Sequence, residues 1–127
     1  MRLFIAVLLF GFGTFAQAAE WVLVSQISNN IREVDKNSIR GAKPVLSFTS
    51  RHVIDDASEF KVGHHAVKYL VMEHRVDCDK RSTVVLSSEA QRADGSMISK
   101  QQLLAQEPNA VLQDSVDEDV LKFVCTQ

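Results

Sequence analysis

Hydrophobic and polar residues alternate along most of the chain after residue 20, with the period of two that is typical of β-strands. The pattern predicts strands over residues 21–27, 31–34, 45–54, 67–78, 83–92 and 97–99. Turn-forming residues separate them, and Asp94-Gly95 is a strong hairpin signal because such turns need positive φ angles. Short turns between successive strands favour a single antiparallel sheet of about five to six strands.

The alternation also assigns residues to the two faces of the predicted sheet. The expected apolar faces are Trp21, Leu23 and Ile27 in the first strand, Leu46, Phe48 and Ile54 in the third, Leu70, Met72, Val76 and Cys78 in the fourth, and Val84, Leu86 and Ala90 in the fifth. Between the strands, residues 35–41 indicate a helical turn or a compact loop closed by glycine, residues 55–66 a long polar hairpin loop, and residues 100–114 an irregular connection.

At the end of the chain the hydrophobic period changes to that of an amphipathic helix over residues 115–125. Ser115 and Glu118 form a capping-box pattern at its start, in which each side chain bonds a backbone N–H of the first turn. Glu118, Asp119 and Lys122 fill the polar side. The alternative is a strand over residues 120–124, because this valine-rich segment also suits β-structure. The pattern therefore predicts an α+β fold in which the helix packs on one face of the sheet.

The first 18 residues have the pattern of a signal peptide, with Arg2, an apolar run over residues 3–15 and Ala16-Gln17-Ala18 as a small-x-small cleavage motif. The apolar run is shorter than the roughly 20 residues that a spanning helix needs, although an N-terminal membrane anchor is the alternative. No cysteine follows the cleavage position, so no lipid anchor is expected. We therefore expect a single domain over residues 19–127, periplasmic or secreted after cleavage near Ala18.

Composition narrows the classes of function. The formal net charge of −2 gives no general attraction to phosphate backbones, so we expect no nucleic-acid partner. The two cysteines, Cys78 and Cys125, are the even number that predicts one disulfide in an exported protein. Asp77 and Asp79 flank Cys78 and would disfavour a reactive thiolate, so a catalytic cysteine is not favoured. The sequence contains no motif of a hydrolase, a phosphate-binding loop or a zinc protease, and we expect no enzymatic activity.

The loop over residues 55–66 is the candidate binding site, with Phe60, His64 and His65 as its candidate residues. A metal site is the alternative, because Asp55, Asp56 and Glu59 lie in the same loop, with His52 and His74 on the flanking strands. Adjacent histidines in an extended chain point in opposite directions, however, and His74 falls on an apolar face as a hydrogen-bonded core histidine would. We therefore assign no metal and no cofactor.

Four segments spread along the chain carry a resemblance to a known family. They are residues 19–24 (AEWVLV), Val34-Asp35 with Ser38-Ile39, Asp77-Cys78, and residues 121–125 (LKFVC). With these segments the chain resembles the surface-adhesin protein E family, which comprises small exported proteins of Gram-negative bacteria. The resemblance implies an antiparallel sheet of about six strands with a C-terminal helix tethered to it by a disulfide. It also implies adhesion, since the founding adhesin binds host extracellular-matrix proteins.

We accordingly interpret the sequence as an exported, non-enzymatic binding protein, with a host matrix protein or a periplasmic protein as its partner. The alternatives are a periplasmic structural or stress protein, or an inhibitor of a lysozyme-type enzyme; metal binding is less favoured. A homodimer is compatible with each of these functions.

Overall fold

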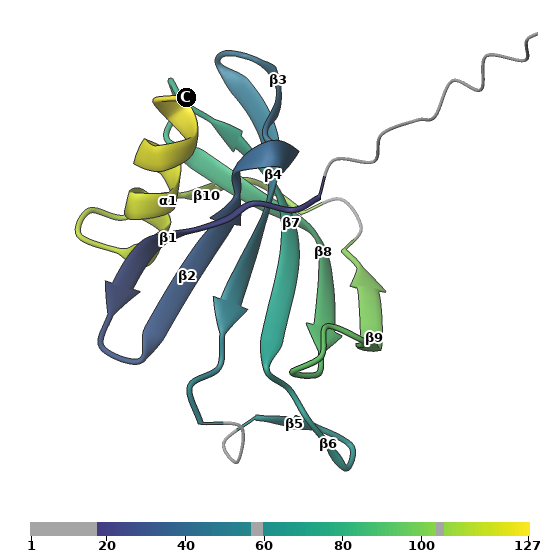
Figure 1. Cartoon of the computed structure of the whole chain (residues 1–127). Helices are drawn as coiled ribbons and strands as arrows, with labels where there is room; N and C mark the ends of the chain where they lie inside the picture. The colour runs from purple at the N-terminus through teal and green to yellow at the C-terminus, as the bar shows by residue number, and fades with distance from the viewer. Residues whose placement is uncertain (1–17, 57–59, 104–105) are drawn as a thin grey trace, which may run out of the picture.

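The computed structural model describes residues 18–56, 60–103 and 106–127 of the chain. The expected signal peptide lies outside this part, except for Ala18. The main feature of the described residues is one antiparallel sheet, ordered β1-β2-β4-β7-β8-β10, with β3 paired to β4 and β9 paired to β8 (Figure 1). Its strands are β1 (Trp21–Ile27), β2 (Asn30–Asp35), β3 (Arg40–Ala42), β4 (Val45–Val53), β7 (Tyr69–Asp77), β8 (Ser82–Gln91), β9 (Met97–Gln102) and β10 (Asn109–Ala110).

Three short elements complete the described fold. A 3-10 helix, η1 (Lys36–Ser38), follows β2, and β5 (Lys61–Val62) pairs with β6 (His65–Ala66) in a small hairpin below the sheet. The antiparallel sheet predicted from the alternation is confirmed, but it has eight strands rather than five or six. The additional strands β3 and β10 have three and two residues, too few to produce a readable period.

The short strand β3 depends on Gly41. Its φ angle is +106°, and a Cβ atom at this position would lie 2.8 Å from the carbonyl oxygen of Val45. Only glycine adopts this conformation at low cost, so it lets β3 pair closely with the start of β4. This is the glycine that the sequence indicated as the end of a compact loop.

Two β-bulges change the predicted assignment of faces. In β1 the register shifts between Leu23 and Ser25, so Trp21 pairs with Asp35 while Ile27 pairs with Asn30. The alternation of β2 puts Asp35 and Asn30 on opposite faces. The prediction that Trp21 and Ile27 share a face is therefore wrong.

In β8 a second shift has the same consequence. Val84 pairs with Arg75 and Ala90 pairs with Leu70, and the alternation of β7 puts these two partners on opposite faces. The prediction that Val84 and Ala90 share a face is therefore wrong. An extra residue in one strand reverses every side chain beyond it, and neither bulge carries a glycine or proline that would reveal it.

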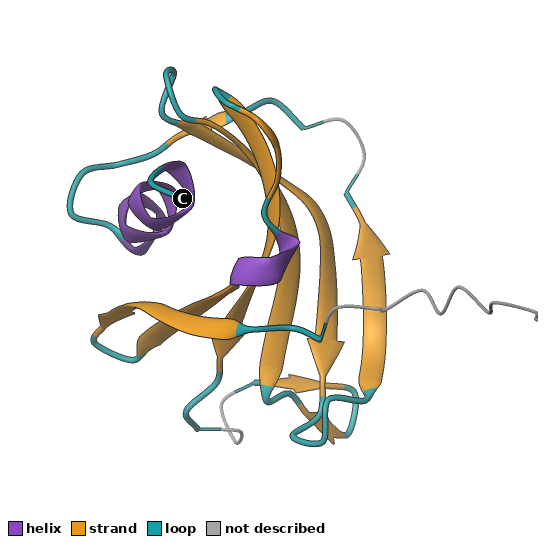
Figure 2. Cartoon of the chain, turned by 45° about the horizontal axis from the view of Figure 1, so that its top comes forward, coloured by secondary structure: helices purple, strands orange, loops and turns teal. Residues whose placement is uncertain are grey.

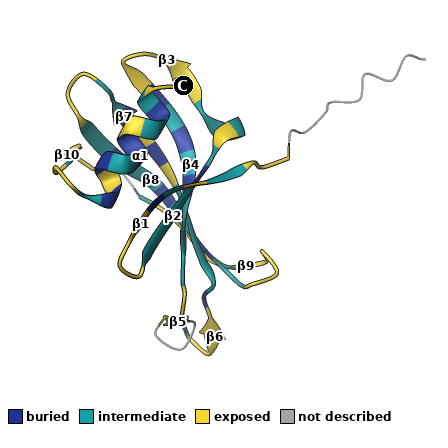
Figure 3. Ribbon diagram, turned by 60° about the vertical axis from the view of Figure 1, so that its left-hand side comes forward, coloured by how far each residue is buried: buried dark blue, intermediate teal, exposed yellow. Residues whose placement is uncertain are grey.

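The sheet curves around α1 (Val116–Cys125), which lies along its concave face (Figure 2). The helix contacts β1, β2 and β4. Figure 3 shows the buried residues gathered where the helix meets the sheet. The core consists of Val34, Leu46, Phe48 and Val76 from the sheet and Val116, Val120, Leu121 and Val124 from the helix. Packing of this apolar stripe explains why the valine-rich segment is helical rather than extended.

The start of α1 follows the predicted capping pattern in part. The Ser115 Oγ accepts a hydrogen bond from the Glu118 N–H at 3.2 Å, but the Glu118 carboxylate accepts one from the Asp114 N–H at 3.4 Å. Glu118 is also buried rather than solvent-facing, because Arg81 reaches it from the turn before β8 at 2.6 Å. Its contacts, first with Lys122 at 3.2 Å, lower the pKa of Glu118.

The predicted disulfide between Cys78 and Cys125 is confirmed, with a Cα–Cα distance of 6.0 Å. Cys78 immediately follows β7 and Cys125 is the last residue of α1, so the bond joins the helix to the central part of the sheet. In the part of the chain that the structure describes, no helix is long and apolar enough to cross a membrane.

Candidate functional site

The three candidate binding residues lie around the β5–β6 hairpin, at the end of the molecule away from α1 (Figure 1). Phe60 precedes β5, its side chain is 40% exposed, and its carbonyl accepts a hydrogen bond from the Val67 N–H at 3.1 Å. His64 is exposed in the hairpin turn. His65 lies in β6, where its Nδ1 is 3.4 Å from a guanidinium nitrogen of Arg92. The segment expected to be a plain polar loop thus contains a hairpin.

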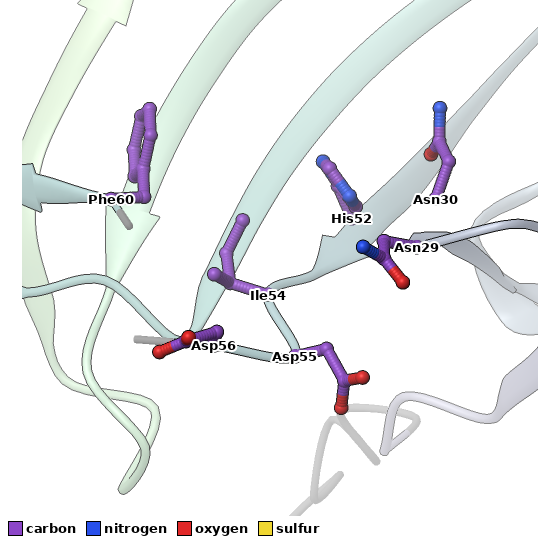
Figure 4. Close-up of a pocket in the computed structure, with 7 residues that line it drawn as sticks. All are labelled: Asn29, Asn30, His52, Ile54, Asp55, Asp56 and Phe60. Carbon is purple, nitrogen blue, oxygen red and sulfur yellow. The ribbon is translucent and has the colours of Figure 1, made fainter. Parts of the chain in front are cut away.

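Beside this hairpin is a hollow of about 510 Å³ (Figure 4). It is lined by Asn29, Asn30, His52, Ile54, Asp55, Asp56 and Phe60. In Figure 4 the Ile54 side chain lies between those of Phe60 and His52. The hollow therefore has a small apolar wall, Ile54 and Phe60, and is otherwise lined by amide, imidazole and carboxylate groups. Of the three candidate residues, only Phe60 lines it.

The concave face of the sheet carries a basic cluster next to this hollow, formed by Arg32, His52 and His74. Arg32 pairs directly with His52 across β2 and β4. The Nε2 of His74 is 2.7 Å from the Ser50 Oγ, and its ring stacks on Phe48 with centroids 5.0 Å apart. The expectation that His74 is a hydrogen-bonded core histidine is confirmed, since it is only 5% exposed.

Burial lowers the pKa of all three members of this cluster, and the charge of Arg32 lowers it further for the two histidines. Burial, followed by the charge of Arg32, lowers the pKa of His74 to about 4. The same two causes lower the pKa of His52. Burial lowers the pKa of Arg32, and the charge of Asp117 partly opposes this. Both histidines are therefore held neutral near pH 7, while the arginine keeps its charge.

Some polar atoms of this region have no hydrogen-bond partner among the described residues. They are the Oδ1 of Asn30, the Nε of Arg32 and the Nδ1 of His74, each with almost no exposed surface. Arg32 also forms no ion pair within 4.0 Å in the described part of the chain. Buried polar atoms are nearly always hydrogen-bonded in proteins, so these three atoms are exceptions within the described part of the chain.

On the opposite face of the sheet, Arg51 stacks between two aromatic rings. Its guanidinium carbon is 4.2 Å from the ring centre of Trp21 and 4.3 Å from that of Tyr69. A guanidinium nitrogen also lies 3.1 Å from a carboxylate oxygen of Glu33. Aromatic residues on both sides and a paired charge are a structural arrangement that joins β1, β2, β4 and β7.

No three His, Cys, Asp or Glu side chains converge on a common point among the described residues. Glu59, one of the potential ligands in the sequence, lies outside them. His52 and His74 are on the concave face and His64 and His65 are in the hairpin, so the four histidines divide between two places.

These features define a class of small single-sheet protein whose last helix is disulfide-tethered to the concave face. The chain belongs to the surface-adhesin protein E family, whose model matches residues 21–126. Two crystal structures of Haemophilus influenzae protein E have a similar fold. Crystal form II has a TM-score of 0.56 and 9% sequence identity, covering 87% of this chain and 97% of that one. The selenomethionine form has the same TM-score with 10% identity, covering 87% and 93%. No curated protein matches the sequence.

Proposed function

We propose that the mature chain is an exported, non-enzymatic adhesin that binds a protein of the host extracellular matrix. The observation that carries this proposal is membership of the surface-adhesin protein E family over residues 21–126. The signal-peptide pattern over residues 1–18 supports export. A periplasmic protein or a lysozyme-type enzyme would be the partner if the mature chain stayed inside the outer membrane.

The end of the molecule that carries the β5–β6 hairpin is the proposed contact surface. Phe60 is a large apolar residue that is 40% exposed there, and His64 and His65 are exposed beside it. Exposed aromatic residues often dominate the free energy of protein–protein binding. At the other end, α1 is committed to the core of the sheet, and much of its surface serves stability.

Among the described residues, Ser50 and His74 most resemble a catalytic pair, and their surroundings argue against catalysis. The Ser50 Oγ and the His74 Nε2 are 2.7 Å apart, as a nucleophile and its general base would be. Ser50 has no exposed surface, however, and the His74 Nδ1 has no orienting carboxylate among the described residues. A substrate carbonyl could not reach the hydroxyl, and the pKa of His74, about 4, makes it a weak base near pH 7.

The proposal is tested by binding of the purified mature protein to a panel of immobilised extracellular-matrix glycoproteins, measured by biolayer interferometry. We expect Phe60→Ser to weaken binding about tenfold or more, since a central aromatic contact contributes about 2 kcal/mol. Leu112→Ser is the matched control, because Leu112 is 72% exposed and precedes α1 at the other end of the molecule. Binding to none of the glycoproteins would refute matrix adhesion, and equal loss in both variants would refute the proposed surface.

A further inference from the structure

We propose that a groove between β3 and the C-terminal end of α1 binds a sulfated polysaccharide chain through Lys36, Arg40 and Lys43. This cationic groove has a volume of about 360 Å³, and the three residues line it. It lies at the end of the molecule away from the β5–β6 hairpin, where the chain leaves α1 beside β3 (Figures 1 and 3). The proposal therefore goes beyond adhesion to a matrix protein, because both the surface and the chemical class of the partner differ.

The fold brings together residues of several consecutive elements around this groove. Lys36 is in η1, Arg40 is the first residue of β3, and Lys43 lies in the turn between β3 and β4. The pairing of β3 with the start of β4 places this segment next to the core under α1. The cations consequently surround an apolar base, which consists of Ile39, Leu46 and Val124.

Every charged side chain that lines the cationic groove is positive. All three are exposed, and no ion pair within 4.0 Å joins any of them to a carboxylate of the described residues. The adjacent Asp35 is engaged elsewhere, because its Oδ1 accepts hydrogen bonds from the N–H groups of Glu20 and Asn37 at 2.9 and 3.0 Å. A cluster of like charges without paired carboxylates creates a local positive potential, which attracts anions.

Two negative groups border the cationic groove without neutralising it. Arg40 also lines a second hollow with Glu73, but the two side chains form no ion pair within 4.0 Å. At the end of α1 the Phe123 carbonyl accepts hydrogen bonds from Thr126 Oγ1 at 3.1 Å and Gln127 Nε2 at 2.9 Å. The C-terminal end of a helix carries only about half a negative charge, which three cations exceed.

The rest of the molecule makes this attraction local. The formal net charge of the chain is −2, so the protein as a whole does not attract polyanions. A polyanion that binds is therefore directed to the part of the surface where cations gather. Among the hollows lined by described residues, the cationic groove has three such side chains and no acidic one.

The arrangement of the charges favours a long polyanion over a single small anion. A small anion is held tightly where several donors converge on it, but the base between these three cations is apolar and offers no side-chain donor. A chain with sulfates along its length can place a different sulfate against each cation. Export, which the signal-peptide pattern predicts, favours an extracellular polysaccharide over a nucleic acid.

A lipid surface fits the cationic groove less well. Protein segments that lie on a membrane combine cationic side chains with large apolar ones that enter the lipid. None of the most exposed large apolar side chains of the described residues lines the groove; they are Leu23, Ile27, Val45, Phe60, Met97 and Leu112. Leu46 and Val124, at its base, are buried in the core and cannot enter a lipid layer. These observations favour the polysaccharide.

The test measures binding of the mature protein to a heparin octasaccharide by isothermal titration calorimetry. The control ligand is a heparosan octasaccharide, which has a similar sugar backbone with carboxylates but no sulfates. We expect heparin to bind about tenfold or more tightly than heparosan, and its affinity to fall about tenfold or more between about 50 and 200 mM NaCl. Equal affinity for the two oligosaccharides, or no binding of heparin at about 50 mM NaCl, would overturn the proposal.

Substitutions at exposed positions locate the site. Lys36→Gln, Arg40→Gln and Lys43→Gln should each weaken heparin binding by about twofold to fivefold, and the triple variant by about tenfold or more. Lys100→Gln is the matched control, because Lys100 is an exposed lysine of β9 that does not line the cationic groove. A triple variant that binds heparin as tightly as Lys100→Gln would overturn the site. If the triple variant fails to fold, the single variants decide, and unchanged affinity in all three would overturn it.

Two further probes separate a polysaccharide from other polyanions. They are an oligothymidylate of matched charge and vesicles that contain phosphatidylglycerol. Weaker binding of both than of heparin supports the proposal, and binding of either as tight as that of heparin overturns it. Phe60→Ser separates this site from the proposed adhesion surface: it should leave the heparin affinity unchanged, and loss of heparin binding in this variant would overturn the location.

Discussion

His74 is the residue whose burial has the clearest measurable consequence. Its ring is 5% exposed, stacked on Phe48 and hydrogen-bonded to Ser50, with Arg32 nearby. Burial lowers its pKa to about 4, below the value of 6.5 that an unfolded chain shows. Between pH 4 and pH 6.5 this imidazole is therefore neutral in the folded protein and takes up a proton when the protein unfolds.

We therefore predict that this histidine makes the free energy of unfolding decrease as the pH is lowered. The contribution is fully present above pH 6.5 and is lost progressively as the pH falls toward 4, because the unfolded state binds the proton first. Between pH 7 and pH 5 the loss is about 2 kcal/mol. His52, whose pKa is also lowered, acts in the same direction.

Urea unfolding of the wild-type protein and of His74→Gln at the two pH values measures this loss. The glutamine variant should lose most of the difference, whereas His64→Gln, at an exposed position, should keep it. A wild-type protein equally stable at pH 7 and pH 5 would contradict the prediction.

Arg51 provides a second prediction for a single residue. It stacks on Trp21 and Tyr69 and pairs with Glu33, and the side chains of both ion-pair partners are 19% exposed. We expect Arg51→Ala to lower the free energy of unfolding by about 2 kcal/mol, because it removes the guanidinium's contacts with two aromatic rings and a partly buried ion pair. Arg75→Ala, an exposed arginine of β7, should change it by less than about 0.5 kcal/mol. Similar losses in both variants would show that the aromatic stack contributes nothing.

At the scale of the elements, α1 is attached to the sheet by the disulfide between Cys78 and Cys125. The disulfide joins residues 47 apart in the chain, and the chain-entropy model gives such a cross-link about 4 kcal/mol. We predict that Cys78→Ser and Cys125→Ser lower the melting temperature by similar amounts, with the double variant no less stable than either. Thermal unfolding followed by circular dichroism measures this, and two alkylatable thiols in the oxidised native protein would contradict it.

The sequence was informative for elements that are long enough to show a period. The strands at residues 21–27, 45–53 and 69–77 and the capped helix follow directly from their patterns. The faces beyond the two bulges were predicted wrongly, since one unpaired residue near Val24 or Leu86 reverses the alternation without changing composition. Both bulges could be located only from the partners on the neighbouring strand.

The candidate site was predictable only in part, for a related reason. Phe60 stands out in the sequence because it is an aromatic residue in a polar loop. Arg32 does not, because it is one charged residue in a short strand and its neighbours His52 and His74 come from β4 and β7. The order β2-β4-β7, which brings the three together, is a property of the sheet and not of any one segment.

At the scale of the whole molecule, the segment that follows the predicted cleavage site is held by the sheet. The Glu20 N–H donates to an Asp35 carboxylate oxygen at 2.9 Å, and the Lys36 N–H donates to the Glu20 carbonyl at 2.9 Å. We predict that the exported protein begins at Ala19, as the motif Ala16-Gln17-Ala18 indicates.

Intact-mass spectrometry of the periplasmic and surface fractions measures this start. Ala18→Arg should block cleavage and leave the uncleaved precursor in the cell, whereas Ala19→Ser should be processed normally. A wild-type mass that still includes residues 1–18 would contradict the prediction.

The contact of α1 with β1 and β2 has a consequence for the order of events during export. A chain that crosses a membrane from its N-terminus delivers these two strands first, and α1 only after every strand of the sheet. The concave face therefore stays without its cover until the last segment arrives, and Cys78 has no partner to oxidise with until Cys125 follows. In an exported chain, the helix that covers the concave face and closes the disulfide is therefore the last element to become available to the fold.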